Sequence, residues 1–249
     1  MPPGIEAKVD AALTRAPKIA KAAEGERKPI TIKDAMDAVA PRPRKKKPAV
    51  TPAPAKDFGS DSRAAEEWGQ AGFKAQFDAL EQSEKDAILA YTGSSTEVNE
   101  AMRSALRPDP AVVKLIRSVS SALSKSTVPE PVFAYRGVRD ELARQLKQLD
   151  VGAEYTQPSF CSTSLSRKQA EAFAATRVTS QNVVIRLRVP SGANGLYVNA
   201  GGEDIEGGYS AHVHERELLL PAGSTFRILG KHAGADYTEI EAELITDGR

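Results

Sequence analysis

Two glutamates at alternate positions, Glu215 and Glu217, are the acidic pair best placed for chemistry in this sequence. Glu-x-Glu occurs four times, so the pattern alone carries little information. This copy differs from the others because it follows the Gly-rich segment Gly192–Gly208 and precedes the apolar run Leu218–Leu220. The alternation of a strand would place both carboxylates on one face. Two carboxylates held side by side repel each other, so we expect a partner or a function to compensate.

Arg136 and Ser162 are further candidates, for a site that binds an anion or a sugar. A guanidinium fork can hold phosphate oxygens through two contacts, and Gly137 beside Arg136 would let a ligand approach the backbone. The hydroxyl of Ser162 could bond a sugar or orient a carboxylate without adding charge. Each residue also has a plain structural interpretation: an exposed strand-end arginine and a polar turn before a helix.

A metal site is not expected from the sequence. Cys161 is the single cysteine, which excludes a disulfide scaffold and any site built from several thiolates. His212 and His214 stand at alternate positions, but no third histidine or cysteine cluster accompanies them, so we expect ordinary polar loop residues. The glycines at 201–202 and 207–208 belong to neither a GxGxxG nor a Walker pattern, so they are not expected to cradle a phosphate.

The elements that must position these residues change in character along the chain. Residues 60–126 show helical periodicity, and we expect four helices there, the second ending near Tyr91 and the third covering Thr96–Leu106. After Pro131 short strands dominate. We expect strands at Val132–Val138, Phe160–Leu165, Val183–Val189, Glu215–Leu220, Thr225–Leu229 and Tyr237–Ile245, and helices at Asp140–Leu149 and Ser166–Thr176. Helices first and strands afterwards predict an α+β fold with a largely antiparallel or mixed sheet.

The N-terminal part differs from the rest in composition. Residues 1–60 carry 13 basic and 7 acidic side chains, a net charge of +6, whereas residues 61–249 carry 21 and 26, a net charge of −5. All 14 aromatic residues lie at or after Phe58, so the first segment cannot bury enough apolar surface to fold. We therefore expect a disordered, basic, Pro-rich tail over residues 1–57 and one domain over residues 58–249.

The same composition disfavours several classes of protein. No apolar run approaches the roughly 18–20 residues that cross a bilayer, so no membrane span is expected. The N-terminus lacks the continuous apolar core of a Sec signal peptide. The acidic domain argues against a specific nucleic-acid partner, although the basic tail could contact polyanions.

Three motifs, taken in order, resemble the R-S-E class of mono-ADP-ribosyltransferases, in particular the toxins and exoenzymes of the clostridial binary-toxin type. They are Tyr-Arg-Gly at 135–137, Phe-Cys-Ser-Thr-Ser at 160–164 and Glu-Arg-Glu at 215–217. The resemblance covers about residues 80–245. It implies a mixed fold of N-terminal helices and two small perpendicular sheets. NAD would bind in the cleft between the sheets as co-substrate, without a metal ion.

The resemblance also implies which residues bind NAD. Arg136 would grip the NAD phosphates or the adjoining ribose, and the backbone of Gly137 would bond the nicotinamide amide. Ser162 would hold the catalytic glutamate and the nicotinamide ribose in register, while Thr163 supports the strand. Phe173 would pack on nicotinamide or, equally, be a core residue of its own helix.

The same resemblance implies which residues catalyse the reaction and which recognise the acceptor, the group that receives ADP-ribose. Glu217 would be the catalytic glutamate and Glu215 the residue that handles the acceptor. In the family a glutamate at that place goes with arginine acceptors, so we expect an arginine. Tyr209 lies in the loop that recognises the protein substrate in relatives, and this loop is two or three residues longer here than in the binary toxins.

Two other functions stay open at this point: an NAD glycohydrolase with water as the acceptor, and a non-catalytic binding module on the same fold. A hydrolase does not need Glu215, and a non-catalytic copy has no physical reason to retain Arg136, Ser162 and Glu217. We expect a toxin or effector that modifies a host target protein. It would be secreted or injected into the host cytosol without a Sec signal, or packaged in a phage particle. The tail would then contact a secretion chaperone or a phage capsid.

Overall fold

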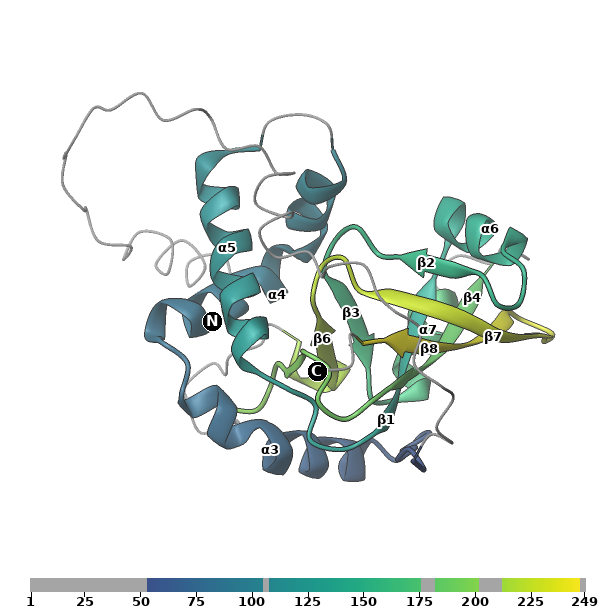
Figure 1. The fold of residues 1–249 in the computed structure, drawn as a ribbon, viewed down its shortest axis with the longest axis horizontal. Helices are drawn as coiled ribbons and strands as arrows, with labels where there is room; N and C mark the ends of the chain where they lie inside the picture. Colours follow the sequence, from purple (N-terminus) through teal and green to yellow (C-terminus); the bar gives the residue numbers. More distant parts are fainter. Residues whose placement is uncertain (1–52, 105–107, 176–181, 202–211, 247–249) are drawn as a thin grey trace, which may run out of the picture.

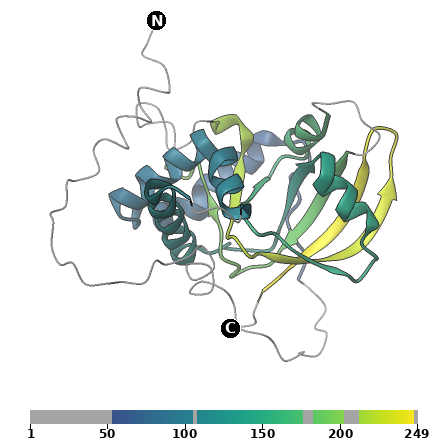
Figure 2. The ribbon, with the colours of Figure 1, turned by 90° about the horizontal axis from the view of Figure 1, so that it is seen from above.

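Helices and strands occupy separate parts of the chain in the computed structural model, which describes residues 53–104, 108–175, 182–201 and 212–246. The first helices are α3 (Ser62–Asp78), α4 (Gln82–Arg103) and α5 (Pro110–Lys125). The later elements are β1 (Val132–Val138), α6 (Asp140–Gln148), β2 (Glu154–Thr156), β3 (Cys161–Ser164), α7 (Arg167–Ala175), β4 (Val183–Val189), β5 (Leu196–Tyr197), the 3-10 turn η1 (Val213–Glu215), β6 (Glu217–Leu220), β7 (Thr225–Ala233) and β8 (Thr238–Ile245). Figure 1 shows α4 and α5 to the left of the strands and α3 below them, and Figure 2 shows from above that α4 and α5 lie beside the strands. The predicted α+β class is confirmed.

None of the described helices is both long and apolar enough to cross a membrane.

Helices α4 and α5 are held together at one buried carboxylate, Glu84. One of its oxygens accepts the backbone N–H of Glu81 at 3.0 Å, which caps the start of α4. Its other oxygen accepts the hydroxyl of Ser121 and pairs with the ammonium of Lys125, each at 2.6 Å, and both partners lie on α5. The side chain that caps one helix therefore also fixes its neighbour.

The second and third predicted helices form one element, α4. Its backbone departs from helical angles at Ser94 (φ −136°, ψ 26°), inside the expected break. The hydroxyl of Thr92 donates to the carbonyl of Leu89 at 2.9 Å, and such a bond competes with the helical ladder and bends it. The polar and glycine residues at 92–95 thus produce a kink instead of a helix end.

The eight strands within the described residues belong to one hydrogen-bonded order, β2-β7-β8-β4-β1-β3-β6-β5. Neighbours are antiparallel except β4 and β8, which are parallel. Strands β1 and β4 pair along their whole length, whereas β1 and β3 share the single register pair Tyr135–Ser164. The two sheets expected from the resemblance are therefore two groups of strands that join at this narrow contact.

Residues 53–57, which the sequence assigns to the tail, pack against the sheet. The carboxylate of Asp57 accepts the hydroxyl of Tyr135 at 2.5 Å and the guanidinium of Arg186 at 2.8 Å. Lys56 forms a parallel bridge with β1. The folded part therefore begins before the predicted boundary, because these residues supply polar partners and a backbone pairing that composition does not reveal. The rest of the predicted tail lies outside the described residues.

Candidate active site

Arg136 lies near the end of β1 with its guanidinium turned toward β3. Its Nη1 donates to the carbonyl oxygen of Ser162 at 2.8 Å and lies 3.6 Å from Sγ of the buried Cys161. Its Nε is buried and has no hydrogen-bond partner among the described residues. A buried N–H without a partner is costly, so this arginine has a donor to offer to an anionic ligand.

Ser162 and Glu217 project from the same face of two adjacent antiparallel strands. Strands β3 and β6 pair Ser164 with Glu217, which makes Ser162 and Glu217 diagonal neighbours. Thr163 points to the opposite face, where its buried hydroxyl donates to the carbonyl of Leu218 at 2.6 Å. Thr163 thus ties β3 to β6, while Ser162 faces the acidic side chain.

The carboxylate of Glu217 interacts with three other candidates, Ser162, Glu215 and Arg136. Although the residue keeps some exposure, desolvation disfavours the charged form and raises the pKa of Glu217 to about 7. A hydrogen bond from Ser162 opposes that rise in pKa, the negative charge of Glu215 adds to it, and the positive charge of Arg136 opposes it. The residues of the three sequence motifs therefore meet in one place.

Tyr91 and Asn99 extend this cluster into the helices, and neither was a candidate from the sequence. The hydroxyl of Tyr91 lies 3.1 Å from that of Ser162 and accepts the side-chain amide of Asn99 at 3.0 Å. The two residues stand on either side of the kink at Ser94. Asn99 Oδ1 is buried without a partner among the described residues. The signal in the sequence was a helix that carries a tyrosine and an asparagine around a break.

Glu215 does not lie on the strand of Glu217, contrary to the prediction. It ends the turn η1, and Arg216 after it adopts a left-handed conformation (φ 48°) before β6 begins. The carbonyl of Glu215 accepts the hydroxyl of Ser164 at 2.6 Å, and the guanidinium of Arg216 reaches Glu66 on α3 at 3.2 Å. These contacts hold a sharp bend where sequence alternation predicts a straight strand. The two carboxylates still lie close enough for the negative charge of Glu215 to raise the pKa of Glu217.

Gly137 is a glycine because helix α7 occupies the space of a side chain. A Cβ built there would lie 2.2 Å from the carbonyl oxygen of Ala170 and 2.9 Å from Cβ of Phe173. The close packing of α7 therefore requires a glycine at this position, whether or not a ligand approaches its backbone. Phe173 is 43% exposed, which excludes the core alternative and places an aromatic ring at the surface beside Gly137.

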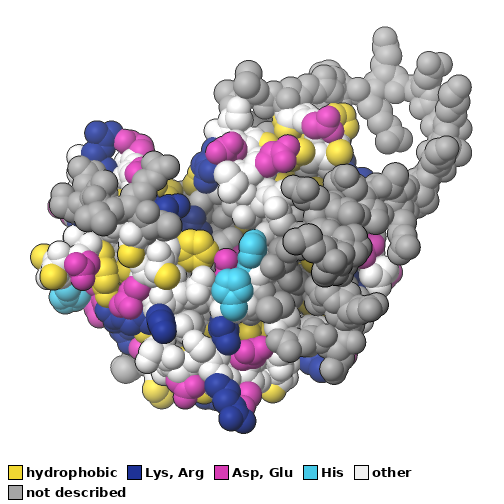
Figure 3. All heavy atoms as spheres, turned by 180° about the vertical axis from the view of Figure 1, so that it is seen from behind, with side chains coloured by type: hydrophobic (Ala, Val, Ile, Leu, Met, Phe, Trp, Pro, Cys, Tyr) yellow, Lys and Arg dark blue, Asp and Glu magenta, His cyan; other side chains and the backbone are white. Residues whose placement is uncertain are grey.

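The turn before β6 also carries the two histidines. His212 and His214 are exposed, and an adjacent pair of histidine side chains is visible on the face shown in Figure 3. Burial raises the pKa of Glu215, and the two histidines oppose that rise. The sequence offered no third metal ligand beside the two histidines, whereas the structure places the Glu215 carboxylate next to them. Tyr209 lies outside the described residues.

Comparison with known proteins places this arrangement in a family. The family of ADP-ribosyltransferase exoenzymes matches residues 65–247. The chain belongs to this family. This exoenzyme is 26% identical over 201 residues to the epidermal cell differentiation inhibitor of Staphylococcus aureus, over 68% of this chain and 75% of the relative. Membership confirms the resemblance of the three motifs.

Solved structures of such enzymes share the fold. The exoenzyme is similar to Plx2a, an ADP-ribosyltransferase toxin from Paenibacillus larvae, with a TM-score of 0.63, 24% identity and coverage of 76% of this chain and 99% of that one. It is also similar to C3stau2 from S. aureus with NAD, with a TM-score of 0.62, 21% identity and coverage of 78% and 100%. The chain is thus an NAD-dependent mono-ADP-ribosyltransferase of the toxin family with the predicted fold.

The described residues suit NAD as co-substrate. Arg136 Nε and Asn99 Oδ1 are a buried donor and a buried acceptor, both without partners among the described residues. They belong to the same network as Ser162 and Glu217. A dinucleotide with phosphate, hydroxyl and amide groups can satisfy such atoms.

Proposed function

We propose that this exoenzyme transfers ADP-ribose from NAD to an arginine side chain of a host protein and releases nicotinamide. The observation that carries the proposal is the coupling of the desolvated Glu217 to Ser162 and Arg136, with a second carboxylate, Glu215, at the adjoining turn. One carboxylate would act on the bond that breaks and the other on the acceptor.

Glu217 acts on the bond between nicotinamide and ribose. As this bond lengthens, its electron pair leaves with nicotinamide and positive charge builds on C1 of the ribose, as in glycoside hydrolysis. The Glu217 carboxylate accepts a hydrogen bond from the ribose 2′-hydroxyl and stabilises that positive charge in a site from which water is largely excluded. Ser162 orients the carboxylate, and Arg136 holds the phosphates through the donors it does not spend on the Ser162 carbonyl.

Glu215 acts on the incoming guanidinium. A guanidinium nitrogen forms the new bond to C1 and loses a proton, so the acceptor needs a carboxylate that orients it and takes up positive charge. Burial raises the pKa of Glu215, which makes it a better proton acceptor than an ordinary carboxylate. Water needs no such help, so a carboxylate at this turn supports an arginine acceptor over hydrolysis.

The test measures two activities side by side: nicotinamide release from NAD and transfer of labelled ADP-ribose to agmatine. Glu217→Gln is expected to lower both by about 10²–10³-fold, since it removes a preorganised charge. Glu215→Gln is expected to abolish transfer and leave most of the hydrolysis. Glu241→Gln, from another Glu-x-Glu on β8, is the matched control and should change neither activity.

The other functions give distinct results in this assay. Nicotinamide release without transfer to agmatine or to proteins of a host lysate would identify a glycohydrolase. No release at all would identify a binding module. Retained transfer in Glu215→Gln would contradict the arginine assignment, and equal loss of both activities would mean that the two carboxylates act as one unit.

Delivery is a further part of the proposal. The 13 basic residues and the prolines within residues 1–60 suit a handle for a secretion chaperone or a phage capsid. The enzyme would then reach the host cytosol by secretion or injection, or inside a phage particle. Tyr209 stands in the segment that precedes the acceptor carboxylate, and we assign it to recognition of the host protein.

A further inference from the structure

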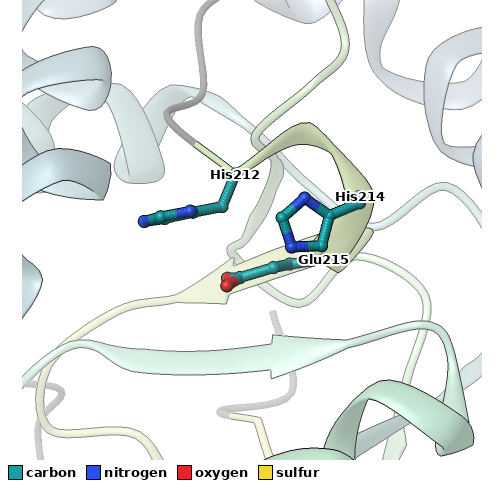
Figure 4. A group of neighbouring side chains, drawn as sticks. All are labelled: His212, His214 and Glu215. Atoms are coloured by element: carbon teal, nitrogen blue, oxygen red, sulfur yellow. The ribbon is translucent and has the colours of Figure 1, made fainter. Parts of the chain in front are cut away.

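Three potential metal ligands converge at the turn before β6. His212, His214 and Glu215 project to the same side of η1, as Figure 4 shows. One ligand atom from each residue lies within 4.8 Å of the other two. The imidazole centroids are 6.1 Å apart and the rings are nearly perpendicular, at 83°. The turn thus brings two imidazoles and a carboxylate together within four residues of sequence.

These donors suit one class of metal ion. Zn²⁺ binds imidazole nitrogen and carboxylate oxygen at about 2.0–2.2 Å, and a tetrahedral site spaces its ligand atoms by about 3.4 Å. The observed spacing of up to 4.8 Å must therefore shorten by at most about 1.4 Å, which rotation of the exposed histidine side chains can supply. A water molecule would complete the four ligands. Mg²⁺ prefers oxygen ligands in an octahedron and should bind poorly here.

The surrounding charges leave room for a cation. The guanidinium of Arg216, the nearest basic group in sequence, donates to the backbone carbonyl of His214 and to that of Ser62 at 3.3 Å, and its charge is paired with Glu66 at 3.2 Å. Glu217 adds negative charge beside Glu215. A cation bound to the Glu215 carboxylate would relieve both the repulsion between the two glutamates and the cost of burying Glu215.

We propose that His212, His214 and Glu215 form a Zn²⁺ site and that the bound ion blocks the acceptor carboxylate. The inhibitory part rests on the proposed function, because it requires Glu215 to orient the acceptor. Zn²⁺ bound to the Glu215 carboxylate cancels the negative charge that would attract a guanidinium, and it places positive charge where the cationic acceptor must dock. Transfer should therefore fall in the presence of zinc.

The site is tested by calorimetric titration of the metal-free full chain with ZnCl2 at pH 7.5, with MgCl2 in parallel. We expect one Zn²⁺ per chain and no comparable Mg²⁺ binding. His212→Ala and His214→Ala should each weaken Zn²⁺ binding by at least about 10–100-fold. Loss of a residue that only supports a metal ligand already costs that much, and each histidine is proposed to bind the ion directly. His232→Ala is the matched control, because it removes the third and last histidine of the chain, which lies on β7. Cys161 is buried and does not compete for the metal.

Activity separates the two parts of the inference. Zinc should reduce transfer to agmatine in the unmodified protein and in His232→Ala, but not in the His212→Ala/His214→Ala double variant. Absence of saturable Zn²⁺ binding, or binding that the histidine variants leave unchanged, would overturn the site. Tight binding without loss of transfer would overturn the block. Failure of the proposed function would appear separately, as absence of transfer in the zinc-free protein, and the calorimetry decides the site in either case.

Discussion

The hydroxyl oxygens of Tyr91 and Ser162 lie 3.1 Å apart, although the residues are 71 positions apart in sequence. Tyr91 comes from the helical part and Ser162 from strand β3. The ring of Tyr91 packs edge-on against that of Phe160, with the ring centroids 5.3 Å apart, so the Tyr91 hydroxyl has a defined position. Burial raises the pKa of Tyr91 to about 12, and the nearby charge of Glu217 adds to this rise, so the hydroxyl keeps its proton at neutral pH. The contact therefore links the helices to the serine that orients Glu217.

Removing this hydroxyl should impair catalysis without unfolding the protein. Tyr91→Phe keeps the ring in the core and deletes the hydrogen bonds with Ser162 and Asn99, each of which contributes about 0.5–1.5 kcal/mol. We expect kcat for nicotinamide release to fall roughly 2- to 10-fold, with little change in the KM for NAD, because Tyr91 positions Ser162 and does not grip the phosphates.

Tyr197→Phe is the matched control for that substitution. The hydroxyl of Tyr197 is also buried but has no hydrogen-bond partner among the described residues. Its removal should leave kcat unchanged and keep or raise the Tm. An equal drop in kcat in both variants would show that the tyrosine at 91 acts through general stability alone.

Arg136 should be irreplaceable by lysine. Lysine keeps the charge but cannot both donate to the Ser162 carbonyl and present a planar fork to a phosphate. Loss of a charge-assisted contact of about 1.5–3 kcal/mol predicts a rise of roughly 10- to 100-fold in the KM for NAD. Steady-state kinetics test this against Arg63→Lys, an exposed arginine on α3, and an unchanged KM in a folded Arg136→Lys protein would remove Arg136 from the site.

The N-terminal boundary can be tested by truncation. A chain that begins at Ala53 should release nicotinamide like the full chain, because the site contacts described above all come from residues after this point. A chain that begins at Phe58 loses the contacts of Asp57 with Tyr135 and Arg186. We expect it to be less stable by about 2 kcal/mol, since these bonds involve charged groups. Thermal unfolding of the two proteins measures the difference, and equal Tm values would place the boundary at residue 58 after all.

Glu84 predicts how stability depends on pH. Its contacts with Lys125, Ser121 and the backbone outweigh burial and lower its pKa in the folded protein. A lowered pKa contributes stability that is present above the unfolded value and is lost as the pH falls through the folded value. Glu84→Gln should therefore cost about 1 kcal/mol at pH 7, and the difference should shrink below about pH 4.5, the ordinary pKa.

The measurement for Glu84 is thermal unfolding of both proteins between pH 7 and pH 3.5. Glu67→Gln serves as the control, because Glu67 forms an exposed pair with Arg63. That substitution should leave the Tm nearly unchanged throughout. A difference between Glu84→Gln and the unmodified protein that grows as the pH falls would contradict the lowered pKa.

Local patterning was enough to predict most of the elements. Strand β4 (Val183–Val189) was predicted with its observed bounds, and β1 likewise, because apolar alternation is a property of neighbouring residues. The three motifs with Arg136, Ser162 and Glu217 were found in sequence because each is a short run of residue types. The family followed from their order.

What the sequence could not decide depends on contacts between distant residues. The bend at Arg216 relies on Glu66 of α3, so Glu215 leaves the strand that alternation predicts. Gly137 is needed by α7, and the network of Tyr91 and Asn99 crosses from helix to sheet. Side-chain periodicity records which face of an element is buried but not what it is buried against. The sequence alone therefore determined the elements, the charged motifs and the family, whereas the tertiary structure decided which side chains meet Glu217 and where Glu215 points.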